Sequence, residues 1–158
     1  MNWQEVVAHP GLQNLPFKIE LNEWGQVVMS PVKLAHSAYQ GIISELLRAW
    51  RKDGRILPEC AIWTRKGTKA ADVAWFSDER WQMVKGQAEA SIAPELCVEV
   101  SSASNTGKEL REKRKLYFEQ GAEEVWHCRQ DGKIEFFNPQ GKLANSILFP
   151  DFPTQVEI

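Results

Sequence analysis

The sequence lacks the features of a secreted, membrane-spanning or zinc-binding protein. It has only three cysteines, Cys60, Cys97 and Cys128, and no Cys-x-x-Cys pair. Its three histidines do not have zinc-ligand spacing. No apolar run is long enough to cross a bilayer, and the first residues lack the basic and apolar parts of a signal peptide. We therefore expect reduced, mostly buried cysteines in a cytoplasmic protein without a membrane partner.

Common nucleotide-binding and hydrolase motifs are also missing. The chain has no Gly-x₄-Gly-Lys-Ser/Thr loop, no Gly-x-Gly-x-x-Gly fingerprint and no Gly-x-Ser-x-Gly elbow. There is no excess of positive charge, because 19 basic and 21 acidic residues give a net charge of −2. Basic residues still cluster locally, most densely in residues 108–115. Such a cluster suits either a polyanionic partner or a solvated helix face.

What is present predicts one domain, residues 1–158, with an apolar fraction of 43%. Helices are predicted at 3–8, from Ser30-Pro31 to about Trp50, and from the cap at Thr106 to Gly121. Strands are predicted at 17–21, 26–29, 56–63, 70–76, 95–100, 124–128 and 133–137. A polar stretch around 77–80 and a loop up to Pro94 are predicted between two of them, and the tail is irregular or strand-like. This order predicts an α/β (α+β) fold with a mixed central β-sheet flanked by helices and an N-terminal β-hairpin.

Two carboxylates interrupt apolar strands. Asp72 lies in Ala70-Ala71-Asp72-Val73-Ala74, and Glu99 lies in Leu96-Cys97-Val98-Glu99-Val100. A buried carboxylate is unfavourable unless it is paired or binds a cation. The pair therefore indicates a metal site, since hard oxygen ligands suit Mg²⁺.

A lysine on the second long helix completes this set. Leu110, Lys113 and Tyr117 are spaced i, i+3 and i+7 and share one face. We expect that face to meet the sheet and Lys115, rotated by roughly 200°, to face solvent. Two acids and a lysine suit metal-assisted phosphodiester hydrolysis. The alternative is structural: Asp72 would cap a loop or pair with Arg65 or Lys69, and Glu99 would pair with Lys113, without chemistry.

The ordered motifs resemble the PD-(D/E)XK nuclease signature and, more closely, the Uma-two putative restriction endonuclease family. The matching segments are Ile19-Glu20-Leu21 with Gly25, Ser30-Pro31 with His36, Ala71-Asp72-Val73-Ala74, Pro94 to Ser102, and Lys113, Tyr117, Gly121 and Trp126. Ala71 stands where the family has proline, and Ser101 stands at the Glu-x-Lys lysine position. In the family interpretation, Lys113 supplies that lysine, with Lys115 as the weaker candidate.

The resemblance implies a restriction-endonuclease-like core that binds Mg²⁺, with Mn²⁺ as a substitute. Asp72, Glu99 and the Val100 backbone carbonyl would hold the metal. Glu20 would lie at the margin of the site, and His36 matches a family position of less certain role. The implied function is hydrolysis of DNA by an endonuclease, for which a homodimer would be natural. The alternative is a catalytically weak or inactive module that binds nucleic acid or protein.

Overall fold

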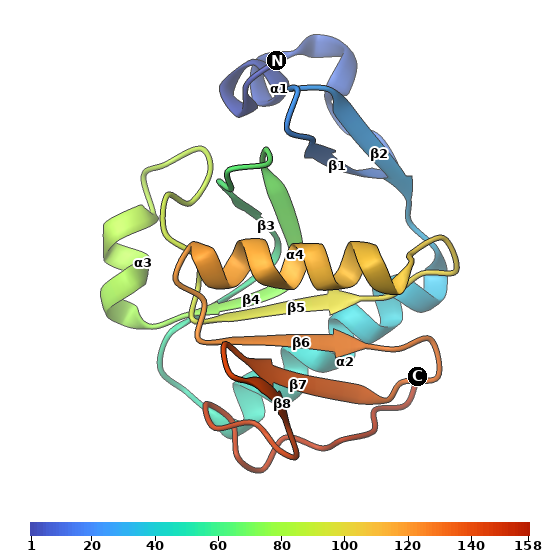
Figure 1. Ribbon diagram of the computed structural model, residues 1–158, viewed down its shortest axis with the longest axis vertical. Coiled ribbons are helices and arrows are strands. Elements are labelled where there is room, and N and C mark those ends of the chain that lie inside the picture. Colours follow the sequence, from blue (N-terminus) through green and yellow to red (C-terminus); the bar gives the residue numbers. More distant parts are fainter.

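A six-stranded mixed β-sheet forms the centre of the molecule, with long helices on both faces (Figure 1). The computed structural model describes residues 1–158. The helices are α1 (Trp3–Ala8), α2 (Leu34–Trp50), α3 (Asp78–Val84) and α4 (Gly107–Glu119), with a 3-10 turn at Pro10–Leu12. The strands are β1 (Phe17–Leu21), β2 (Val27–Pro31), β3 (Arg55–Ile62), β4 (Lys69–Phe76), β5 (Leu96–Val100), β6 (Glu124–Cys128), β7 (Ile134–Asn138) and β8 (Gly141–Leu143).

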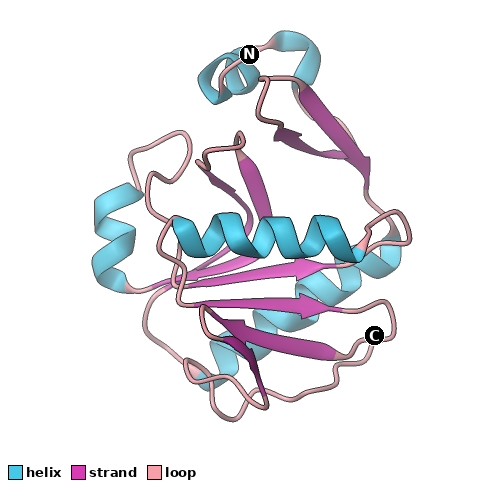
Figure 2. Cartoon of the chain, in the orientation of Figure 1, coloured by secondary structure: helices cyan, strands magenta, loops and turns pink.

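The strand order of the main sheet is β3-β4-β5-β6-β7-β8. Strands β5 and β6 are parallel, with α4 as their connection, and all the other neighbouring pairs are antiparallel. Helix α2 covers one face of the sheet and α4 the other (Figure 2). The predicted fold class is therefore confirmed. The central strands β5 and β6 are buried along their whole length, as a sheet covered on both faces requires.

The predicted N-terminal hairpin is also confirmed, as the separate two-stranded sheet of β1 and β2. It lies beside the main sheet and is not part of it (Figure 1). The prediction that Ser30-Pro31 opens a helix is wrong. Both residues belong to β2, where Ser30 pairs with Lys18 and Pro31 with Phe17, and α2 begins only at Leu34. A proline at the end of an edge strand is tolerated because its missing N–H need not join a ladder.

The prediction of a polar stretch around 77–80 and a loop up to Pro94 is wrong in its first part, where residues 78–84 form α3. Ser77 caps this helix by accepting a hydrogen bond from the Arg80 N–H, and Asp78 and Glu79 follow in the first turn. These are ordinary helix-start signals. The helix was missed because it is short and its segment is mostly polar. Helix α3 packs its Val84 into the core on the α4 side of the sheet.

The three cysteines are free and buried, as predicted. None of the helices has both the length and the apolar character of a membrane span.

His127 on β6 is buried, and its Nε2 atom has no hydrogen-bond partner. Burial, assisted by the Arg114 charge, lowers the pKa of this imidazole to about 4. The unfolded chain would bind the proton near its ordinary pKa of about 6.5, so stability is lost as the pH falls below that value. Between pH 7 and pH 5, we expect His127 to lower the free energy of unfolding by about 2 kcal/mol.

Urea denaturation at the two pH values would measure this loss, with His127→Gln as the comparison. The glutamine does not titrate, so its stability should depend less on pH by the same amount. Equal pH dependence in the two proteins would mean that other groups cause it.

Candidate active site

The two predicted acids lie side by side where the β4–β5 ladder ends. The last pairs join Val73 to Val98, which places Asp72 next to Glu99. Beyond this point, each carboxylate accepts a backbone N–H from the opposite strand. The Asp72 N–H donates to Glu99 Oε2 at 3.3 Å, and the Val100 N–H donates to Asp72 Oδ2 at 2.7 Å. Asp72 and Glu99 are only 1% and 3% exposed, so the charges are enclosed by protein.

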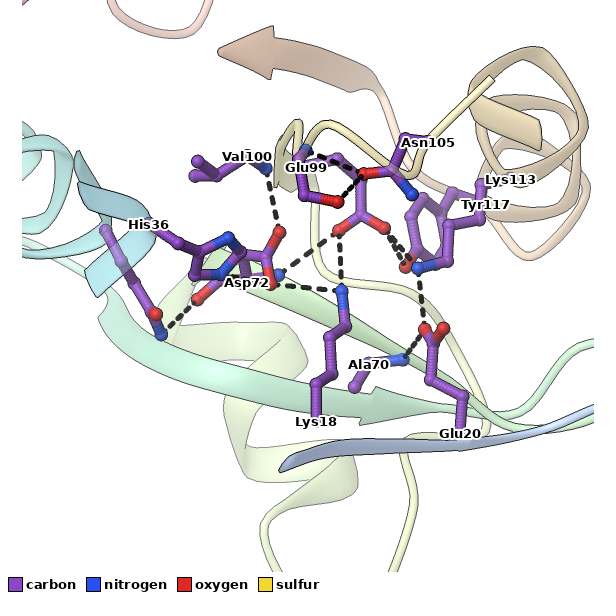
Figure 3. Close-up of polar contacts among 12 residues, drawn as sticks. Lys18, Glu20, His36, Ala70, Asp72, Glu99, Val100, Asn105, Lys113 and Tyr117 are labelled. Atoms are coloured by element: carbon purple, nitrogen blue, oxygen red, sulfur yellow. Dashed lines mark hydrogen bonds and ion pairs between the residues drawn. The ribbon is translucent and has the colours of Figure 1, made fainter. Parts of the chain in front are cut away.

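Helix α4 brings Lys113 to the same place, as its helical face predicted. Its Nζ lies 2.5 Å from Glu99 Oε1 and 2.7 Å from Glu20 Oε2, and thus links β5 to the hairpin (Figure 3). Glu20 also accepts the Ala70 N–H at 2.7 Å. One turn further along α4, the Tyr117 hydroxyl donates to Glu99 Oε1 at 3.4 Å. Glu20, Lys113 and Tyr117 therefore all belong to the Asp72–Glu99 cluster.

Two further residues contact Asp72 from outside the sheet. His36 on α2 lies with Nε2 3.2 Å from Asp72 Oδ1, which places this predicted residue in the site. The other residue, Lys18 on β1, was not predicted. Its Nζ lies 3.0 Å from Asp72 Oδ1 and 3.5 Å from Glu99 Oε2, between the two carboxylates (Figure 3). A signal for Lys18 existed, because residues two apart on a strand share a face and Glu20 was already a candidate.

Two secondary candidates lie apart from the cluster. Ser101 follows β5, and its backbone N–H donates to the Cys128 carbonyl, but its side chain contacts none of the acids. Lys115 is exposed on the outer side of α4, as predicted. Ser101 stands at the family's lysine position and supplies no charge. The ammonium groups that contact Glu99 belong to Lys113 and Lys18.

One of the ion pairs named in the structural alternative is present. Glu99 does pair with Lys113. Asp72 does not pair with Arg65 or Lys69: Arg65 pairs with Glu119, and Lys69 donates to the Leu21 carbonyl. The latter two pairings were wrong because both basic side chains have other partners.

Burial and the neighbouring opposite charges shift the pKa values of these groups in opposite directions. Burial alone would raise the pKa of Asp72, but Lys18 and His36 hold that pKa well below its usual value. For Glu99, burial outweighs the two lysines and raises the pKa. Burial would lower the pKa of Lys18, but the surrounding carboxylates raise it above its usual value. Asp72 is thus kept as a carboxylate, and Lys18 as an ammonium ion.

The cluster opens into a groove of about 650 Å³ between the hairpin, β4 and α4. Its lining includes five lysines (Lys18, Lys66, Lys69, Lys108 and Lys113) and six acids (Glu20, Glu23, Asp72, Glu99, Glu109 and Glu112). The formal charge of these groups is therefore −1. A polyanion would meet both attraction and repulsion there.

The carboxylate oxygens of the site suit a hard cation, although lysine ammonium groups pair with them in this structure. Asp72 and Glu99 present carboxylate oxygens to a common point, and the Lys18 ammonium shows that this point accepts positive charge. The structure has no group of three or more His, Cys, Asp or Glu side chains arranged to hold a metal ion. An ion there would be held by these two carboxylates and by water, as Mg²⁺ commonly is.

Comparison with known proteins agrees with this architecture. A family model described as Uma2, putative restriction endonuclease, matches residues 3–156. The chain belongs to the Uma2 family. A search of curated proteins found no match for this Uma2 chain.

Among solved structures, the Uma2 chain is similar to a putative nuclease of the DUF820 group from Anabaena variabilis ATCC 29413. The two chains are 17% identical, and the TM-score is 0.71. The match covers 89% of this chain and 80% of the other. At this identity, the likeness shows a shared fold. The predicted family is thus confirmed by the family model, and the description of that family is that of a nuclease.

Proposed function

We propose that this Uma2 protein is a Mg²⁺-dependent endonuclease that hydrolyses phosphodiester bonds of DNA, with Mn²⁺ able to replace Mg²⁺. The observation that supports this most is the convergence of Asp72, Glu99 and Lys113 at one end of a groove. Each comes from a different element, so the cluster depends on the fold and not on one local motif. The description of the family, putative restriction endonuclease, supports the proposal, and a protein described as a putative nuclease shares the fold.

In the proposed mechanism, Asp72 and Glu99 would hold the metal together with water, and the Val100 carbonyl would be a further ligand. When bound, the ion would polarise the phosphoryl oxygen and acidify an attacking water. The Lys113 ammonium, already beside Glu99, would stabilise negative charge that develops on the phosphate. His36 and the Val100 N–H orient the Asp72 carboxylate, and Tyr117 orients Glu99.

Charge in the groove supports a nucleic-acid substrate that binds together with the metal. One divalent ion would change the formal charge of the lining groups from −1 to +1. A groove with net positive charge attracts a phosphate backbone, whereas the metal-free groove would not. We further propose that two copies act as a homodimer, because a two-fold dimer would present one site to each strand of a duplex. The free cysteines suit a reducing, cytoplasmic setting.

A second candidate is a module with the nuclease fold that binds nucleic acid or protein without cleaving. It is favoured by one observation: every carboxylate oxygen of Asp72 and Glu99 already has a hydrogen-bond or ion-pair partner. Such a cluster can be purely structural.

A cleavage assay separates the two candidates. The protein would be incubated with supercoiled plasmid, linear duplex, single-stranded DNA and RNA, in Mg²⁺, in Mn²⁺ and in chelator. The proposal requires DNA cleavage that depends on a divalent ion. Binding of nucleic acid without cleavage of any substrate would favour the module. Linear product formed directly from supercoiled plasmid would support concerted action by a dimer.

Asp72→Asn should weaken Mn²⁺ binding at least tenfold in calorimetry, because one anionic ligand is lost from the site. Asp151→Asn is the matched control, since Asp151 is exposed and makes none of these contacts. Equal Mn²⁺ affinity in Asp72→Asn and the native protein would show that the ion binds elsewhere.

A further inference from the structure

The side chain of Lys18 occupies the point on which the two proposed metal ligands converge. Its ammonium bridges Asp72 Oδ1, at 3.0 Å, and Glu99 Oε2, at 3.5 Å. Its side chain is only 11% exposed. Lys18 lies on the hairpin, whereas the two carboxylates lie on strands of the main sheet (Figure 3).

Lys113 does not have this bridging position. It contacts Glu99 and Glu20 but not Asp72, and it would keep both contacts if Lys18 were absent. The other partners of Asp72 and Glu99 are a histidine, backbone N–H groups and a tyrosine hydroxyl. Lys18 is thus the cation that both proposed ligands share.

An ammonium ion and a divalent ion cannot both occupy this point. Mg²⁺ needs its oxygen ligands at about 2.0–2.1 Å, which leaves no room for an ammonium between the same two oxygens. Two cations so close would also repel each other strongly in a buried site. Binding of the metal therefore requires the Lys18 side chain to leave.

The structure provides a way out for that side chain. Lys18 lines the wall of the 650 Å³ groove. Rotation about the bonds of its flexible side chain would move the ammonium into the groove while β1 stays folded. Once there, it would lie among the groups that face the substrate. Withdrawal thus needs no rearrangement of the main sheet.

We propose that Lys18 is a tethered counter-ion that neutralises Asp72 and Glu99 in the metal-free protein, competes with the divalent ion and is displaced by it. This inference rests on the proposed function, because it takes Asp72 and Glu99 as the metal ligands. Lys18 is therefore a residue that sets the metal affinity, and with it the metal concentration at which the site becomes competent.

Calorimetric titration with Mn²⁺ alone tests the competition. Lys18→Met should bind Mn²⁺ at least tenfold more tightly than the native protein, because no ammonium has to be displaced. Lys69→Met is the matched control: it removes the same charge from the same groove, but Lys69 donates to the Leu21 carbonyl and contacts neither ligand. Its affinity should change less than threefold. Mn²⁺ binding by Lys18→Met that is no tighter than that of the native protein would overturn the proposal. An equal gain in affinity in Lys18→Met and Lys69→Met would also contradict it, since the gain would then come from the charge of the groove and not from displacement.

A second measurement uses the native protein and remains decisive if Lys18→Met does not fold. Lysine amines would be acetylated with acetic anhydride with and without saturating Mg²⁺, and the sites counted by mass spectrometry. Labelling of Lys18 should rise at least threefold with Mg²⁺, while the exposed Lys115 stays unchanged. Unchanged labelling of Lys18 at metal saturation would contradict displacement.

The two proposals fail in different ways. If native Mn²⁺ binding depends on Asp72 but neither Lys18 readout changes, the counter-ion proposal is wrong and the proposed function stands. If neither the native protein nor Lys18→Met binds Mn²⁺, both are wrong.

Discussion

Lys113→Met is expected to reduce the rate of metal-dependent DNA cleavage by about a thousandfold, within the range found when a positioned charge or acid–base group is removed. The Lys113 ammonium lies 2.5 Å from Glu99 Oε1, and the Lys113 side chain is only 18% exposed. Methionine keeps most of the apolar stem and removes the charge. The rate would be measured under single-turnover conditions with the metal and the DNA in excess of their dissociation constants.

Lys115→Met provides the control, because it removes the same charge from the same helix two positions later. Lys115 is exposed on the outer side of α4, and its variant should cleave within about threefold of the native rate. A large loss in Lys115→Met with little in Lys113→Met would reverse the assignment of the two lysines. Melting curves for both variants would show whether a lost rate reflects unfolding.

Glu124→Ala should lower the free energy of unfolding by about 3–5 kcal/mol, since several buried donors would lose their acceptor at once. Glu124 is 2% exposed at the start of β6. Its Oε1 accepts hydrogen bonds from Trp126 Nε1 at 2.8 Å and from the Ser146 hydroxyl at 2.7 Å. Its Oε2 accepts the N–H groups of Ile147 and Leu148, both at 2.8 Å.

These bonds fasten the C-terminal segment to the sheet. That segment carries Phe149 and Phe152, whose rings lie 5.9 and 4.6 Å from the Trp126 ring. Loss of Glu124 should therefore loosen an aromatic cluster as well as break hydrogen bonds. Urea denaturation followed by tryptophan fluorescence would measure the change.

Glu123→Ala is the control for this prediction. Glu123 is exposed and directly precedes Glu124, so its removal should change the free energy of unfolding by less than about 0.5 kcal/mol. A loss below about 1 kcal/mol in Glu124→Ala would mean that water or rearranged side chains satisfy the orphaned donors.

Local patterns were sufficient for most elements of the fold. The apolar periodicity of residues 34–50 and the cap at Thr106 predicted α2 and α4, because both signals are contained within a few turns of chain. The errors occurred where two local signals competed. Ser30-Pro31 carries a helix-start signal, yet pairing with β1 places it in a strand. Short α3 was hidden because its seven residues are largely polar.

The sequence by itself identified the charged residues of the candidate site that lie on β4, β5 and α4. Asp72 and Glu99 were recognisable because a carboxylate within an apolar strand is unfavourable without a partner, and this mismatch is visible from neighbouring residues alone. Lys113 was predicted to face the sheet from helical geometry, and its contact with Glu99 confirms that orientation. These inferences need only the periodicity of one element at a time.

Only the tertiary structure decided which cation lies between the two carboxylates. Lys18 and Asp72 are 54 positions apart, and their contact depends on where the hairpin docks against β4. That docking is set by contacts such as the Leu21 N–H with the Thr68 carbonyl, which no local pattern encodes. The distant partners of Glu124, at residues 146–148, were hidden for the same reason, since that segment has no regular secondary structure.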